Sequence, residues 1–203
     1  MDSIYERRSI RKYLPQMPEK ALIGEIIRAG IAAPSAKNRQ PWRFVVFTGQ
    51  AKTELLREME KGLRRELQGE ALLPEVRGGL ADAFHTMQIM HTAPVLILVL
   101  NPGAGSPFDA QNPTSRFAEI ADTLSIGAAV ENMLLKATAL GLGSLWIANT
   151  CFAYPELTAY LKTDAQLVCA VSLGYPDEAP AARPRKAPED VAEYRSSPQN
   201  TVR

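Results

Sequence analysis

Residues 94–101 read PVLILVLN, and this stretch decides the fold because nearly every one of its side chains is apolar. A strand with one face in water alternates apolar and polar residues, whereas a strand buried on both faces is apolar throughout. We therefore expect residues 94–101 to form an inner strand of a sheet that helices cover on both sides. The run is far shorter than the roughly 20 residues that a membrane-spanning helix needs, so no membrane partner is expected.

The segments around this strand predict alternating helices and strands. Three more stretches are rich in β-branched and aromatic residues and are expected to be strands: residues 43–49, 144–149 and 166–175. Helical spacing of apolar residues predicts helices over residues 18–33, 51–67, 75–91 and 118–140, with short ones at 3–6 and 155–161. Residues 101–116 are expected to form a loop. The fold class predicted is α+β, with a four-stranded sheet between helices.

Length and composition fit one globular domain over residues 1–203. The chain has 46% hydrophobic and 22% charged residues, and its formal net charge is +1. A balance so close to neutral, with few aromatic residues, argues against a nucleic-acid partner. The first fourteen residues lack the apolar stretch of a signal peptide, so a cytoplasmic protein is expected.

Cysteine and histidine are too few and too scattered for a metal site. Cys169 lies in the apolar run LVCAV and is expected to be a core thiol, while nothing near Cys151 in sequence would activate it. His85 and His91 are six residues apart, which places them on different faces of a helix. We expect neither a bound metal nor a disulfide.

Two basic segments could bind phosphate. Residues 6–13, ERRSIRKY, place four cations and a hydroxyl within six residues, and residues 183–186, RPRK, form a second basic group far away in sequence. Guanidinium groups clamp phosphate through charge-assisted hydrogen bonds. Either segment could equally be a solvated basic surface.

A polar loop between prolines offers side-chain amides. In PSAKNRQPW, residues 34–42, Asn38 and Gln40 could pair with a ring that presents alternating donors and acceptors, as the pyrimidine edge of a flavin does. Asn and Gln are also common in loops that bind nothing. The distinctive feature is the string NxQPW leading directly into a strand.

The glycines in GLGSLW, residues 141–146, do not form a dinucleotide-binding fingerprint. That motif needs three glycines after a strand and before a helix, whereas these follow a helix and Trp146 occupies the third position. We expect the glycines to end the helix and to let the backbone approach a flat ligand.

Taken in order, four motifs resemble the nitroreductase family: ERRSIRKY, PSAKNRQPWRF, GLGSLWIA and GYPDEAPAARPRK. The resemblance covers nearly the whole chain. It implies a three-layer fold in which helices flank a central mixed or antiparallel sheet. It also implies an intertwined homodimer that holds FMN non-covalently at its interface.

The resemblance also implies roles for individual residues. Arg11 would lie beside N1 and O2 of the flavin, and Leu145 and Trp146 would back its ring. Asn38 and Gln40 would meet the ring, while Pro34 and Ser35 would approach it from the partner subunit. The phosphate and ribityl chain would be held by Arg7, Arg8, Ser9, Arg183 and Arg185.

The activity implied is transfer of hydride from NAD(P)H through flavin N5 to a small acceptor such as a nitroaromatic or a quinone. No catalytic acid–base pair stands out, and residues 59–91, which usually shape the acceptor pocket, match no motif. Two alternatives stay open. One is an enzyme of the same fold with other chemistry, such as dehalogenation, enone reduction or flavin fragmentation, and the other is a non-enzymatic protein that stores or senses flavin.

Residues 175–203 contain many prolines and almost no core residues, so they are expected to wrap a partner subunit as a C-terminal extension. The small side chains of Gly127, Ala128 and Ala129 would let a helix of the partner approach closely.

Overall fold

The chain folds around a four-stranded antiparallel sheet in the order β1-β2-β4-β3. The computed structural model describes residues 2–69, 72–73 and 78–195. Strands β2 (Val95–Asn101) and β4 (Gln166–Gly174) form the centre, with β1 (Arg43–Phe47) and β3 (Gly143–Ile147) at the edges. Every residue of β2 is buried, which confirms the expectation for the PVLILVLN stretch.

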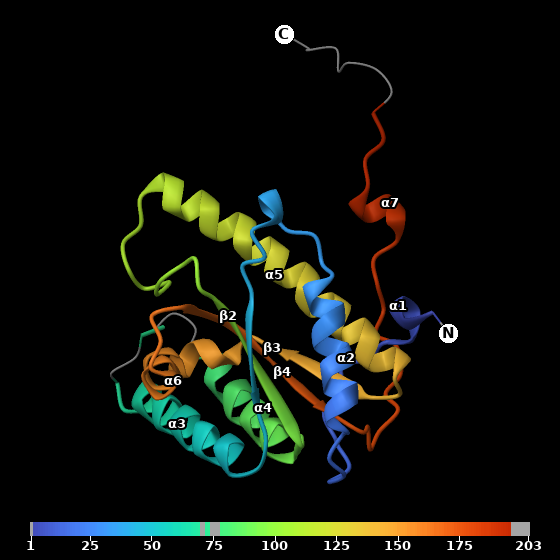
Figure 1. Cartoon of the computed structure of the whole chain (residues 1–203), viewed down its shortest axis with the longest axis horizontal. Helices are drawn as coiled ribbons and strands as arrows, with labels where there is room; N and C mark the ends of the chain where they lie inside the picture. Colours follow the sequence, from blue (N-terminus) through green and yellow to red (C-terminus); the bar gives the residue numbers. More distant parts are fainter. Residues whose placement is uncertain (1, 70–71, 74–77, 196–203) are drawn as a thin grey trace.

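Alternate residues of β2 point into two separate cores. Leu96, Leu98 and Leu100 pack against α3 (Gly49–Leu67), α4 (Leu80–Thr92) and α6 (Tyr154–Leu161). Val95, Ile97 and Val99 face α2 (Lys20–Ile31) and α5 (Pro113–Ala139) on the opposite side. The result is the expected three-layer arrangement of helices, sheet and helices (Figure 1).

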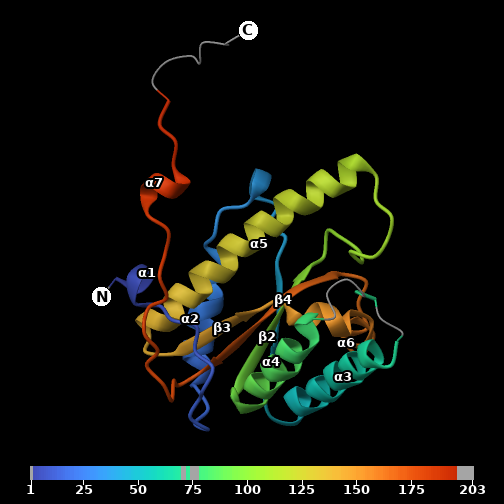
Figure 2. The same ribbon diagram turned by 180° about the vertical axis from the view of Figure 1, so that it is seen from behind.

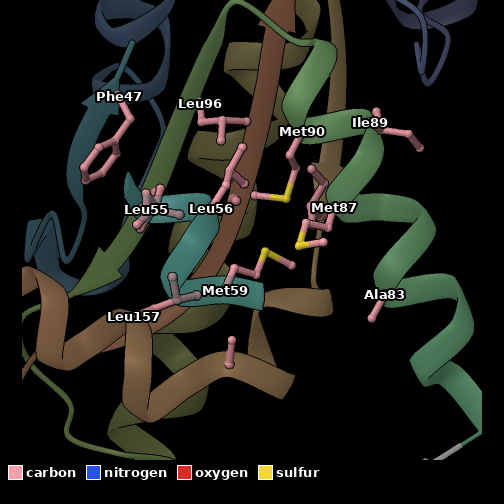
Figure 3. Close-up of a cluster of buried hydrophobic side chains, with 14 of the residues drawn as sticks. Phe47, Leu55, Leu56, Met59, Ala83, Met87, Ile89, Met90, Leu96 and Leu157 are labelled. Atoms are coloured by element: carbon pink, nitrogen blue, oxygen red, sulfur yellow. The ribbon is translucent and has the colours of Figure 1, made fainter. Parts of the chain in front are cut away.

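Methionine and leucine side chains fill the first core. Met59 of α3 and Met87 and Met90 of α4 point toward one another beneath the sheet, with Leu55 and Leu56 beside them (Figure 3). Each of these residues is at most 3% exposed. Burial of one such side chain contributes about 1.5–3 kcal/mol to stability, so this core holds α4 firmly against α3 and the sheet.

Two helix starts differ from the sequence-based expectation. Helix α5 begins at Pro113 rather than at residue 118, because the side chain of Asn112 caps it by accepting a hydrogen bond from the backbone N–H of Ser115. The predicted loop over residues 101–116 is correspondingly shorter. Helix α4 begins at Leu80, and residues 75–77, where it was expected to start, lie outside the described part of the chain.

Residues 9–14 run along the edge of the sheet and join the beginning of the chain to its end. Ser9 pairs with Ser144 and Tyr13 with Pro176 as isolated bridges. Gly143 makes room for this segment, since a Cβ there would lie 2.9 Å from side-chain atoms of Ile10. Sequences more than 160 residues apart are thereby brought side by side.

The C-terminal segment leaves the body of the protein beside α1 (Ser3–Glu6) and runs past α7 (Pro188–Val191) away from the sheet (Figures 1 and 2). Residues 181–195 are exposed, with Val191 67% and Tyr194 91% exposed. Among the helices of the described residues, none has the length and apolarity that a membrane span requires.

Candidate functional site

Arginine side chains from both ends of the chain surround one cavity of about 260 Å³. Arg7, Arg8 and Arg11 come from the N-terminal segment, and Arg183 and Arg185 come from the C-terminal segment. No acidic residue lines this cavity in the described part of the chain. Five guanidinium groups around one small space suit an anion with several oxygen atoms, such as a phosphate.

Hydrogen bonds to backbone carbonyls hold three of these guanidinium groups, those of Arg8, Arg11 and Arg185. Arg8 donates from Nη1 to the carbonyls of Tyr5 (2.7 Å) and Arg7 (2.9 Å). Arg185 donates in the same way to Arg183 and Pro184, both at 3.2 Å. Among the five, Arg7 alone has a carboxylate partner within the described residues, since its Nε lies 3.2 Å from Glu131 of α5. The cavity is thus strongly electropositive.

Glu178 ties the two basic segments together. One of its carboxylate oxygens accepts hydrogen bonds from the backbone N–H groups of Arg11 (2.5 Å) and Lys12 (3.3 Å). The backbone N–H of Asp177 donates to the carbonyl of Lys12 at 2.9 Å, and that of Leu14 donates to Tyr175 at the same distance. This ladder explains why Arg183 and Arg185 reach the N-terminal arginines.

Arg11 also lines a second cavity, of about 190 Å³. Leu145 and Trp146 of β3 line one wall. Trp146 is 42% exposed, and its ring lies beside Gly127 of α5. Cys169 is buried in the adjacent strand β4, which raises the pKa of its thiol to about 12, while a hydrogen bond with Trp146 acts in the opposite direction. Burial likewise raises the pKa of Cys151, and a raised pKa disfavours the nucleophilic thiolate form of a cysteine.

The opposite wall of the second cavity comes from α4. This helix lies within residues 59–91, which the resemblance places at the acceptor pocket, but no motif marked the individual residues. Its residues are Asp82, His85, Thr86 and Ile89. Their spacing of i, i+3, i+4 and i+7 marks one helical stripe. The helical spacing of these four residues can be read from the sequence. Because the stripe mixes polar and apolar side chains, it does not stand out as an amphipathic pattern.

The loop that carries Pro34, Ser35, Asn38 and Gln40 lies at neither cavity. It rises beside the N-terminal half of α5, above the body of the protein (Figures 1 and 2). Asn38 and Gln40 are exposed, and their side-chain amides bond to no other described residue. Within one chain they therefore do not share a cavity with Arg11.

Strained backbone marks this loop as specialised. Lys37, Asn38 and Gln40 have φ angles of 52°, 53° and 50°, in the left-handed region that non-glycine residues seldom adopt. Such residues persist only where their surroundings hold them, and they gather at ligand sites. Here η1 (Ala36–Asn38) lies within the loop, and Ser35 accepts the backbone N–H of Gln40 on its hydroxyl at 3.0 Å.

Helix α5 separates the loop from the arginine cavity. Arg39 donates from Nε and Nη2 to Asp122 at 2.9 and 2.6 Å, whereas Arg7 bonds to Glu131 on the same helix. Nine residues at about 100° each put Asp122 and Glu131 on opposite sides of α5. The two predicted parts of the site thus face away from each other in one protomer.

The glycines of the GLGSLW segment have structural roles within their own chain. Gly141 ends α5 with a φ of 74°, as expected. Gly143 packs against Ile10 and not against open space, so the expectation that it leaves room for a flat ligand is wrong. The described residues contain no group of three or more His, Cys, Asp or Glu side chains that could hold a metal ion.

Comparison with known proteins agrees with this architecture. The nitroreductase family pattern matches residues 4–175. The chain belongs to the nitroreductase family. It is 30% identical over 183 residues to an NADH dehydrogenase/NAD(P)H nitroreductase of Archaeoglobus fulgidus, covering 86% of this chain and 84% of that protein. An NADH dehydrogenase of Thermus thermophilus is also 30% identical, over 85% of this chain and 84% of that protein.

A solved structure has the same fold. A nitroreductase from Desulfovibrio desulfuricans, crystallised with FMN, superposes with a TM-score of 0.71 at 26% identity, covering 95% of both chains. The nitroreductase fold expected from the four motifs is therefore confirmed.

Proposed function

We propose that this protein is an FMN-dependent oxidoreductase that takes hydride from NAD(P)H and passes it to a small acceptor such as a nitroaromatic or a quinone. The observation that carries the proposal is the pair of cavities that meet at Arg11. One is ringed by arginines and suits a phosphate, and the other is walled by Leu145, Trp146 and α4. A ligand with an anionic end and a planar end fits that order.

The residues fit FMN in particular. Arg7, Arg8, Ser9, Arg183 and Arg185 would hold the phosphate and the ribityl chain. Arg11 would place a positive charge beside N1 and O2 of the ring, and the backbone of Leu145 and Trp146 would support the ring. When bound, the flavin supplies the hydride chemistry, and the protein positions it and tunes its charge.

A homodimer would complete the site. In one protomer the loop of Pro34, Ser35, Asn38 and Gln40 lies across α5 from the arginine cavity, so we propose that it serves the partner subunit's site. The face of α5 supports pairing, since Phe117, Ile120 and Leu124 are 74%, 46% and 71% exposed along one helical stripe. Such a patch marks an interaction surface.

Two features refine the proposed interface. Gly127 and Ala128 are partly exposed on α5, but Ala129 is fully buried in its own chain and is not available to a partner. The exposed C-terminal segment beyond residue 181, with Val191 and Tyr194, would wrap the partner as an extension of a single domain.

The test is whether the purified protein carries flavin and what reduces it. We expect a yellow protein from which heat releases FMN, and whose colour NADH or NADPH bleaches until a quinone or nitroaromatic restores it. A colourless protein that takes up no FMN would refute the proposal. Bleaching with no turnover of any acceptor would favour a flavin-storing or flavin-sensing protein instead.

A further inference from the structure

One face of α4 turns a polar stripe toward the second cavity. Asp82 and His85 on this face are exposed, whereas Thr86 and Ile89 are 8% and 6% exposed. The adjacent face of the helix is buried in the core through Ala83, Met87 and Met90. Since the core fixes the buried face, the polar stripe is held at a constant position against the cavity.

Asn149 locks this stripe to the opposite wall. It is the first residue of η3 (Asn149–Ala153), which follows β3 closely. Its Nδ2 donates to Asp82 Oδ2 at 2.9 Å and to Thr86 Oγ1 at 3.0 Å. Both amide hydrogens are thereby used, and α4 is tied to the strand that carries Leu145 and Trp146. His85 lies on the stripe between the two bonded residues.

Three ionisable side chains line this cavity, and they differ in what they can do with a proton. Arg11 carries a guanidinium, which only donates hydrogen bonds. Asp82 accepts the hydrogen bond from Asn149. His85 carries an imidazole, whose two ring nitrogens can donate and accept a proton. It is exposed and makes no hydrogen bond or ion pair with another residue of the described chain.

We propose that His85 is the proton donor to the acceptor, an inference that rests on the proposed function. The acceptors that fit are those reduced at a bond to oxygen, such as quinones and nitroaromatics. The acceptor gains a hydride, which the flavin supplies, and a proton from the imidazolium of His85 neutralises the oxygen on which negative charge develops. The neutral imidazole regains a proton from solvent, to which it is open.

The experiment separates proton transfer from electron transfer. The FMN-loaded protein is reduced with NADH and then mixed with 1,4-benzoquinone, which must gain protons, or with ferricyanide, which takes electrons alone. We expect His85→Gln to lower the ratio of the two second-order rate constants at least about tenfold, as the loss of a general acid does. His91→Gln is the matched control, because His91 lies on the same helix and lines neither cavity.

A second measurement follows the imidazole without turnover. The sequence has two histidines, so the His85→Gln and His91→Gln variants assign both imidazole signals in an NMR spectrum of the ¹⁵N-labelled oxidised holoprotein. Benzoate, which cannot be reduced there, presents the oxygen atoms of an acceptor. We expect benzoate to shift the His85 signal and to leave the His91 signal in place.

The outcomes distinguish this inference from the proposal beneath it. A ratio that stays within twofold of wild type in His85→Gln, or a His85 signal that saturating benzoate leaves unchanged, overturns the role of His85 while leaving the flavin enzyme intact. A wild-type protein that neither NADH nor NADPH reduces overturns the proposed function, and this inference with it.

Discussion

The arginine cavity and the loop of residues 34–42 are both built from polar or basic sequence motifs. They differ in whether one chain brings their parts together. The arginine segments are far apart in sequence and meet in one protomer, because the ladder through Tyr175, Asp177 and Glu178 joins them. The loop is close to the N-terminal segment in sequence but lies across α5 from it. Backbone pairing, and not sequence distance, decides which parts of the site one chain can assemble alone.

We therefore expect only one of the two regions, the loop, to need a partner subunit in order to contribute to a binding site. The arginine cavity exists in a single protomer, so its anion site should form without a partner. The loop has strained backbone, the side-chain amides of Asn38 and Gln40 bond to no other described residue, and the loop lines neither of the two cavities. Each of the following predictions tests one side of this contrast.

The largest effect is expected when the arginine cavity loses two charges. Each charge-assisted hydrogen bond contributes about 1.5–3 kcal/mol, so Arg8→Ala with Arg185→Ala should weaken FMN binding roughly 10²–10⁴-fold. Titration of the apoprotein with FMN, followed by flavin fluorescence, measures this. Lys186→Ala is the matched control, since Lys186 adjoins Arg185 but does not line the cavity. Equal weakening in the control would show that general charge, and not the cavity, binds the phosphate.

A mixed dimer tests the loop. One protomer carries Arg8→Ala and Arg185→Ala, and the other carries Asn38→Asp and Gln40→Glu, which keep side-chain size and tolerate the left-handed backbone. If the loop serves the partner subunit's site, both defects fall in one site and the other stays intact, so about half of the wild-type activity remains under two-fold symmetry.

Two affinity tags purify the mixed dimer, and NADH-dependent quinone turnover per dimer is compared with both mutant homodimers. Activity no higher than that of the mutant homodimers would mean that each loop acts within its own chain. The loop would then not depend on the partner subunit.

The third prediction concerns Arg11, which lies between the two cavities. A fixed guanidinium within about 4 Å of N1 and O2 stabilises negative charge that develops there on reduction by a few kcal/mol. Arg11→Met should therefore lower the flavin midpoint potential by several tens of millivolts, as about 30 mV corresponds to about 1.4 kcal/mol for two electrons. Redox titration checks this, with Lys12→Met as control because Lys12 lines neither cavity. An unchanged midpoint potential would show that the Arg11 side chain does not lie beside the flavin ring.

The sequence predicted the layers of this fold well, because they follow from local patterns. The unbroken apolar run over residues 95–100 required a buried strand. Burial at the ends of helices depends on tertiary contacts as well as on local pattern. Leu67, the apolar last residue of α3, is 62% exposed. Its neighbour Glu66 is 1% exposed, because it binds Arg65 at 2.7 Å and accepts the backbone N–H of Leu72 at 2.9 Å.

The residues of the candidate site that belong to sequence motifs could be predicted. Those that only tertiary packing brings to the site could not. The arginines and the strand of Leu145 and Trp146 came from motifs. The stripe of Asp82 and His85 did not, since no local pattern tells which face of α4 meets β3. The position of Asn38 across α5 depends on the ion pair of Arg39 with Asp122, which links residues 83 positions apart.

The smallest expected effect concerns that ion pair, which anchors the loop to its own chain. The side chain of Asp122 is 7% exposed and that of Arg39 is 37% exposed. Removing Arg39 leaves a nearly buried carboxylate without its charged partner, so Arg39→Met should lower the free energy of unfolding by about 1–2 kcal/mol. Replacing both residues, as Arg39→Met with Asp122→Leu, should recover most of this loss because no unpaired charge remains.

Arg28→Met is the control, since Arg28 pairs with Glu25 on the surface and such pairs contribute about 0–1 kcal/mol. Urea unfolding of the four proteins measures the differences. If Arg39→Met is no less stable than Arg28→Met, the loop is not anchored by its own chain, and its place beside α5 would have to come from the partner subunit.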